Sequence, residues 1–189
     1  MRFFGDDQDW VVRVMQPIAE RQIYSKVWPD CAILPLDDDA THRLKRALDI
    51  GGADKALQYP DGRVAFLAQR FRKYDCSRFD DFTLRCDRPL SGRKTEYQKC
   101  LDALDGSTML AAYYCYGHVN EQETGFLRFR IIDFRRFLEA HRKGLIPEGE
   151  LKANRDSSAR FLAWPFSLLP RSIIFWEKED EDTEPPTIT

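Results

Sequence analysis

The sequence predicts a single domain of the α/β class, in which helices flank a central mixed β-sheet. The chain has 189 residues, a length typical of one domain. A hydrophobic content of 43% and an aromatic content of 13% can supply the core of such a domain. Along the chain the apolar periodicity alternates between helix and strand. The predicted order is helix, three strands, helix, strand, strand, helix, strand, which indicates an α/β or α+β domain.

The N-terminal region predicts a helix with a proline inside it. The apolar residues that recur at helical spacing are Trp10, Val11, Val14, Met15 and Ile18. Asp7 or Asp9 can cap this helix, and Pro17 predicts a kink or a break. After the acidic cluster DDD, a short helix is expected through Leu44 and Leu48, ended by two glycines.

A β-hairpin is expected in the middle of the chain. Residues 53–59 and 64–71 read as its strands, and Pro60-Asp61-Gly62 forms the turn, since proline presets one dihedral angle and glycine supplies a positive φ. Residues 82–86 (FTLRC) predict a third strand.

The second half predicts two helices and three strands. Residues 95–104 have helical spacing. The continuous apolar run 109–116 is typical of a strand covered on both faces, whereas 126–132 alternates and predicts one wet face. Asp133 can cap a helix that ends at Gly144, and 172–176 is the expected final strand.

The charge is unevenly distributed, although the formal net charge is only −2. Ten basic and five acidic residues lie between Arg63 and Lys99, a net charge of +5, while residues 177–189 carry six acidic side chains and one lysine. We therefore expect residues 1–176 to form the domain and 177–189 to be a disordered acidic tail. The basic stretch is either a site for an anionic partner or a solvated face.

Cysteine usage and hydropathy predict a cytoplasmic protein with reduced thiols. The five cysteines form no CxxC pair, and the histidines His42, His118 and His141 lie at no zinc-ligand spacing from them. The N-terminal MRFFGDDQDW turns acidic too early for a signal peptide, and no run of about 18 apolar residues could span a membrane.

The candidate chemistry lies in ADKALQYPDGRVAFLAQRFRKYD, which starts at Ala53. Walker, dinucleotide-binding, HExxH and GxSxG motifs are absent from the sequence. Metal-dependent phosphodiester cleavage needs a hard cation held by oxygen ligands on neighbouring strands, and a positive side chain near the phosphate. A helix with Glu20, a strand with Asp54 and the next strand with Gln69 and Arg70 follow this order.

Three segments, DKALQYPDGRVAFLAQRFRKYD, DDFTLRCDRP and GRKTEYQK, resemble a poorly characterised branch of the PD-(D/E)XK nuclease-like superfamily. Members carry an aspartate on the first strand, Gln-Glu-Arg-Phe-Arg on the second, a strand like Asp-Phe-Thr-Ile-Arg, and a helix that opens with Lys-x-Glu-Phe or similar. Asp54, 70–72, 81–85 and 95–97 match these motifs, and the resemblance covers residues 53–116 directly. It implies a restriction-endonuclease-like fold that acts on DNA with Mg²⁺ or Mn²⁺.

The resemblance also implies roles for individual residues. Asp54 would hold the metal with help from Gln69 and Glu20, and Arg70 would stabilise charge on the phosphate. The residues expected to contact the DNA backbone are Arg72, Lys73, Arg85 and Lys94. Two departures weaken the site: Ala68-Gln69 replaces Gln-Glu, so an amide replaces an acid, and Arg70 replaces the lysine but cannot transfer a proton.

Simpler roles compete with these. Asp54 could be a strand-start acid and Glu20 a helix-surface acid, while Arg72 and Arg85 could pair with Asp80 or Asp81. The tyrosines of 113–116 are expected to be core and rim of a strand. Because side chains alternate along a strand, Gln69 and Arg70 should point to opposite faces unless a bulge intervenes.

The leading functional prediction is a metal-dependent nuclease-like domain acting on DNA, with reduced or lost activity. The alternative is a catalytically silent nucleic-acid-binding or protein-interaction domain on the same fold, with the acidic tail as a possible contact for a protein partner. A metabolic enzyme with an unrecognised pocket ranks third.

Overall fold

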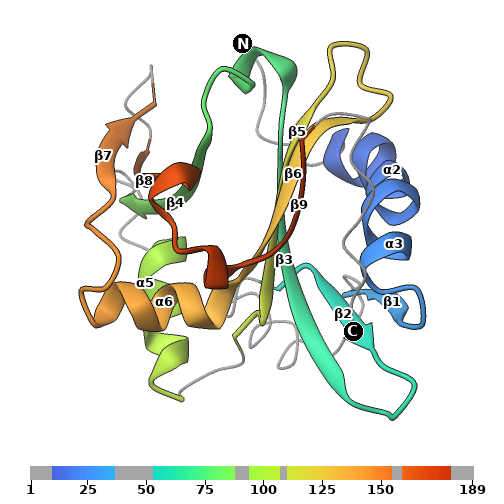
Figure 1. The fold of residues 1–189 in the computed structure, drawn as a ribbon, viewed down its shortest axis with the longest axis horizontal. Coiled ribbons are helices and arrows are strands. Elements are labelled where there is room, and N and C mark those ends of the chain that lie inside the picture. Colours follow the sequence, from blue (N-terminus) through green and yellow to red (C-terminus); the bar gives the residue numbers. More distant parts are fainter. Residues whose placement is uncertain (1–9, 37–52, 88–93, 107–109, 155–158, 180–189) are drawn as a thin grey trace.

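The computed structural model describes residues 10–36, 53–87, 94–106, 110–154 and 159–179, which fold around two β-sheets (Figure 1). The larger sheet has six strands in the order β1-β2-β3-β5-β6-β9. Its strands are β1 (Ala32–Pro35), β2 (Lys55–Gln58), β3 (Val64–Arg72), β5 (Tyr113–Val119), β6 (Phe126–Asp133) and β9 (Ile174–Glu179). Only β3 and β5 run parallel among these neighbours, so the sheet is mixed, as predicted.

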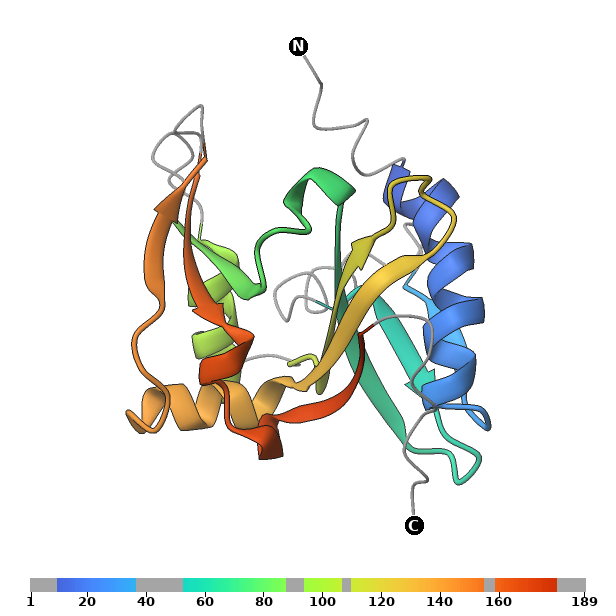
Figure 2. The same ribbon diagram turned by 45° about the horizontal axis from the view of Figure 1, so that its top comes forward.

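The smaller sheet is antiparallel and has the order β4-β8-β7. Its strands are β4 (Asp81–Asp87), β8 (Arg160–Pro165) and β7 (Glu150–Ala153). Two helices, α5 (Glu96–Leu104) and α6 (Phe134–Arg142), lie on the same side of the six-stranded sheet as this smaller sheet (Figures 1 and 2). The chain is therefore α/β with helices on both sides of the central sheet.

Both faces of the six-stranded sheet are covered. We call the face toward the N-terminal helix the helix face; its core residues include Ile23 and Tyr24 of the helix and Leu67 and Cys115 of the sheet. We call the opposite face the inner face; there, side chains of β3, β5 and β6 pack with α5, α6 and the smaller sheet around Phe82. Alternate residues of each central strand thus enter different cores.

The N-terminal helix continues through Pro17, so the predicted break is wrong. It comprises a π turn (η1, Val11–Met15), α2 (Gln16–Ala19), a second π turn (η2, Glu20–Tyr24) and α3 (Ser25–Val27). The Gln16 N–H donates to the Val11 carbonyl, five residues back, and Pro17 follows in the first turn of α2. The wider π turn accommodates the missing N–H of Pro17, and the helical backbone is kept.

The predicted hairpin is confirmed, and its turn has the expected chemistry. The Tyr59 N–H donates to the Arg63 carbonyl and the Gly62 N–H to the Tyr59 carbonyl, both at 2.9 Å. Gly62 has a φ of 84°, which glycine adopts without a steric penalty.

Both predicted helices of the second half are confirmed, with the predicted cap at Asp133 and a further cap at Thr95 that was not predicted. The Thr95 side chain and Gln98 form a reciprocal capping box at the start of α5. The Asp133 carboxylate accepts from the Arg136 N–H at 3.0 Å at the start of α6. A positive φ of 68° at Gly144 follows the end of α6.

Several strand predictions need correction. The sequence did not predict β1, β7 or β8, and β5 starts at Tyr113, later than 109, while β9 continues to Glu179 inside the expected tail. The predicted third strand, β4, leaves the central sheet and pairs with β8, since β5 occupies the position next to β3. The predicted wet face of β6 is wrong, because residues 129–132 are all buried between the two cores.

Some predictions lie outside the described residues: the caps at Asp7 and Asp9, the helix through Leu44 and Leu48, and most of the acidic tail. All five cysteines are free thiols. Within the described ranges, no helix has the length and apolar character needed to cross a membrane.

Candidate functional site

The candidate site lies at the open end of the β2–β3 hairpin, opposite its turn. Asp54 immediately precedes β2, and its N–H donates to the Leu67 carbonyl on β3 at 2.9 Å. Its side chain then continues this ladder, since Oδ2 accepts from the Gln69 N–H at 2.7 Å. The carboxylate is thereby fixed between the strand ends, close to Gln69 as the sequence predicts.

Two polar pairs join the N-terminal helix to this end of the hairpin. The Tyr24 hydroxyl donates to Gln69 Oε1 at 2.7 Å, and the Lys55 ammonium donates to Glu20 Oε1 at 3.4 Å. Burial raises the pKa of Tyr24 well above its ordinary value, so the hydroxyl keeps its proton and remains a donor. Glu20 and Gln69 therefore both lie on the helix face, each held by its own partner.

Lys55 was missed by the sequence analysis. Its side chain is only 2% exposed, whereas that of its partner Glu20 is 46% exposed. Lys55 lies two residues before Leu57, which belongs to the helix-face core, so it shares that face. The available signal was a lysine at an inward position of an otherwise apolar strand, KALQ, because buried lysines are rare unless they are paired.

The environment of Asp54 disfavours its ionised form. Desolvation raises the pKa of the carboxyl to about 7, and nearby Glu96 adds to this rise. The hydrogen bond from the Gln69 backbone works in the opposite direction, as do the charges of Lys55 and Arg70. Since the residue as a whole is exposed at the strand end, water moderates the shift without changing its direction.

Arg70 lies on the inner face, away from the Glu20–Lys55 and Tyr24–Gln69 pairs. Its Nη1 donates to the Thr83 carbonyl at 2.9 Å, and Nη2 lies 3.5 Å from the Glu96 carboxylate. Glu96 also accepts from the Tyr114 hydroxyl at 2.8 Å. The prediction that Gln69 and Arg70 point to opposite faces is confirmed, and the charge of Arg70 nevertheless acts on Asp54.

The candidate oxygen ligands of a Mg²⁺ or Mn²⁺ centre already make polar contacts within the protein. Each candidate ligand has a protein partner: the Gln69 N–H for Asp54, Tyr24 for the Gln69 amide, and Lys55 for Glu20. A buried ammonium beside Glu20 already supplies the positive charge that a metal would bring. Among the residues whose positions are described, no three His, Cys, Asp or Glu side chains form a metal-binding group.

The residues expected to contact DNA do not form one surface. Lys73 stacks over the Trp10 ring at 4.8 Å, while Lys94 pairs with Asp102 on α5. The Arg85 N–H donates to Glu96 on α5 at 3.4 Å, and Arg72 projects from β3 on the inner face.

Asp80 and Asp81 have other partners than those predicted from the sequence. Asp80 pairs with Arg130 at 2.6 Å and with Arg128 at 3.6 Å, and Asp81 pairs with Lys152 at 2.9 Å. The tyrosines are core and rim as expected, since Tyr114 and Tyr116 are buried while Tyr113 is half-buried.

Comparisons of the chain with models of protein families, with curated proteins and with solved structures found no significant match.

Proposed function

We propose that this protein is a nuclease-like domain that binds DNA without metal-dependent cleavage. The nuclease-like part rests on the resemblance of residues 53–116 and on the order of elements around the site. A helix with Glu20, a strand preceded by Asp54 and the neighbouring strand with Gln69 meet at one end of a mixed sheet that has helices on both sides. This order is the one that a restriction-endonuclease-like fold implies.

The loss of cleavage rests on one observation, the Lys55–Glu20 pair in a site whose second acid is Gln69. Two neighbouring carboxylates that bind Mg²⁺ gain affinity from their negative charge. Here one position is an uncharged amide, one acid is neutralised by a buried lysine, and the pKa of Asp54 is raised. The binding part rests on the net charge of +5 between Arg63 and Lys99.

The experiment combines fluorescence anisotropy with labelled DNA and a nicking assay on supercoiled plasmid. We expect DNA affinity that falls steeply with salt and is unchanged by EDTA, together with no nicking in Mg²⁺ or Mn²⁺. Nicking that requires metal and disappears in Asp54→Asn would overturn the proposal in favour of an active nuclease. Absence of DNA binding at low salt would overturn it in favour of a protein-interaction domain.

Calorimetric titration with Mn²⁺ tests whether Lys55 and Gln69 are the reason that metal-dependent cleavage is lost. The parent should show no binding, whereas the double variant Gln69→Glu with Lys55→Met should bind Mn²⁺, because it restores one carboxylate and frees another. The matched control combines Gln69→Glu with Lys26→Met, which removes an exposed lysine of the N-terminal helix, the helix that carries Glu20. Tight Mn²⁺ binding by the parent would contradict the assignment of Lys55 as the resident positive charge.

A further inference from the structure

A row of three nitrogen-bearing side chains crosses the inner face of the central sheet. In the strand register, Arg72 on β3 pairs with His118 on β5, and His118 pairs with Arg128 on β6. Directly cross-strand residues point to the same face, so the three side chains are neighbours. They lie near the carboxyl ends of the parallel strands β3 and β5, the end at which α/β sheets commonly bind ligands.

Each member of this row has a buried nitrogen without a hydrogen-bond partner. Across the described parts of the chain, six buried side-chain nitrogens lack one, and three of them are Arg72 Nε, His118 Nε2 and Arg128 Nε. Half of the unsatisfied nitrogens are thus collected on one cross-strand row, and His118 is only 2% exposed. Buried donors without acceptors are uncommon in folded proteins, and an ion or water at this position is the ordinary explanation.

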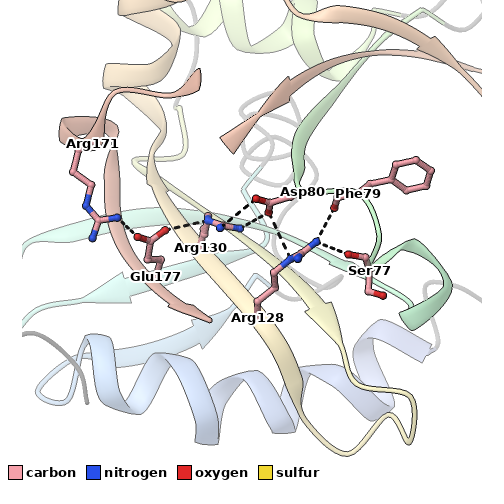
Figure 3. A network of polar contacts seen from close by, with 7 residues as sticks. All are labelled: Ser77, Phe79, Asp80, Arg128, Arg130, Arg171 and Glu177. Atoms are coloured by element: carbon pink, nitrogen blue, oxygen red, sulfur yellow. Dashed lines mark hydrogen bonds and ion pairs between the residues drawn. The ribbon is translucent and has the colours of Figure 1, made fainter. Parts of the chain in front are cut away.

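The row also carries more positive charge than its neighbours neutralise. Arg72 has no ion pair with any described carboxylate; its guanidinium lies beside the thiol of Cys76. Arg128 Nε is 3.6 Å from Asp80, but the same carboxylate lies closer to Arg130, at 2.6 Å (Figure 3). An oxyanion at the row would restore the balance.

The pKa of His118 is lowered in part by this excess of positive charge. Burial, followed by the charges of Arg128 and Arg72, lowers the pKa of its imidazole to about 4. Asp80 and Asp81 act in the opposite direction and do not compensate. An anion bound beside the ring would favour the protonated imidazole, so binding would be coupled to a rise in the pKa of His118.

Residues 73–80 contact two of the three side chains of the row, Arg72 and Arg128. Arg128 Nη2 donates to the carbonyls of Ser77 and Phe79, which fixes the guanidinium and leaves Nε for another partner (Figure 3). The short helix η3 (Tyr74–Cys76) places Cys76 against Arg72, which is half-buried and therefore reaches solvent.

We propose that Arg72, His118 and Arg128 form a binding site for a phosphate group. The phosphate oxygens accept from Arg72 Nε, from Arg128 Nε and from His118 in the form that carries a hydrogen on Nε2. Arginine suits this role because its planar guanidinium stays charged and matches the geometry of phosphate. The group is either a free phosphate or the terminal phosphate of a nucleic acid strand. The site is separate from Asp54 and does not depend on the proposed DNA binding.

The test follows the imidazole resonances of the folded protein by NMR while inorganic phosphate is added. The His118 signal should move, and its titration midpoint should rise with phosphate. His141 should be unaffected and serves as an internal reference, since its Nε2 lies 2.6 Å from the Tyr97 hydroxyl at another place in the fold. An unchanged His118 signal at saturating phosphate would overturn the proposal and assign the unpartnered nitrogens to water.

Two arginine variants distinguish specific phosphate binding at this site from non-specific electrostatic attraction. Arg72→Gln should weaken phosphate binding by about tenfold or more, because it removes one charged donor of the site. Arg63→Gln, in the turn just before β3, removes an arginine whose side chain is 76% exposed and should leave the affinity unchanged. Equal losses in both variants would mean non-specific attraction and would overturn the site.

Oligonucleotides with and without a 5′-phosphate identify the source of the group. Tighter binding of the phosphorylated strand, lost in Arg72→Gln, would assign a strand terminus. A response to inorganic phosphate alone would assign a small phosphate ligand. If DNA fails to bind while phosphate still shifts the His118 resonance, the proposed function is refuted and the phosphate site is supported. If DNA binds while the His118 resonance does not move with phosphate, the phosphate site is refuted and the proposed function is supported.

Discussion

Replacing His118 by glutamine should change how folding stability depends on pH. The imidazole is buried, and its pKa is lowered from 6.5 to about 4 in the folded protein. Between these values the unfolded chain binds a proton that the folded chain does not, so the free energy of unfolding decreases as the pH falls. The stabilising contribution is complete above pH 6.5 and is lost as the pH falls through about 4.

The magnitude follows from the size of the pKa change. Since one pKa unit corresponds to about 1.4 kcal/mol, lowering the imidazole pKa from 6.5 to about 4 is worth about 3 kcal/mol over that interval. A domain of this size has a typical unfolding free energy of about 5–15 kcal/mol, so the effect is measurable. Glutamine keeps a polar side chain and does not titrate, which makes it the appropriate replacement.

The assay is urea unfolding, monitored by tryptophan fluorescence, at a series of pH values from 4 to 7. The matched variant is Asp54→Asn, because the pKa of Asp54 is raised from 3.8 to about 7 and acts with the opposite sign. Its contribution is present below pH 3.8 and is lost as the pH rises through about 7. In the parent the pH dependences contributed by His118 and Asp54 therefore partly cancel. Substituting one residue exposes the pH dependence that the other contributes.

His118→Gln should make stability fall more with rising pH than in the parent, and Asp54→Asn should make it rise more. If the His118→Gln curve runs parallel to that of the parent, His118 is not a buried neutral imidazole and the reasoning fails.

Three further outcomes concern stability and are measured by the same unfolding assay at pH 7. Phe82→Ala should cost about 3–5 kcal/mol, since the ring is fully buried at the centre of the inner-face core; a loss below 1 kcal/mol would contradict that placement. Arg130→Gln should cost up to about 3 kcal/mol, because its side chain is only 7% exposed and pairs with both Asp80 and Glu177, while Arg171→Gln, 77% exposed, should cost less than about 1 kcal/mol. Equal costs would mean that the burial of Arg130 contributes nothing. Gly117→Ala should cost about 1–3 kcal/mol, because its Cβ would meet a phenylalanine ring at 2.7 Å. Gly125→Ala meets only a flexible glutamine side chain at 3.0 Å and should cost less; the reverse order would refute the packing assignment.

The candidate site was predicted only in part. Asp54 and Gln69 could be paired from the sequence because a hairpin with a defined turn fixes which residues lie opposite each other. The face occupied by Arg70 followed from the alternation of side chains. Lys55 was not predicted, although its alternation with Leu57 indicated that it shares a strand face with a core residue.

The phosphate row could not be predicted from the sequence. Arg72, His118 and Arg128 are separated by 46 and 10 positions, and their alignment depends on the register of three strands. Register is set by packing on both faces of the sheet, which a local pattern does not encode. The same reason explains why the smaller sheet, to which β4 belongs, was not predicted.

By itself the sequence determined the features that depend on neighbouring residues: the turn at Gly62, the cap at Asp133, and the amide at Gln69. Each is a local interaction whose chemistry follows from residue type and spacing. Only the tertiary structure decided that the helix continues through Pro17 and that Glu20 is paired with Lys55. It also decided that three unsatisfied nitrogens meet on one row. These features depend on which distant surfaces pack together, and desolvation at those contacts sets the charges that the side chains can keep.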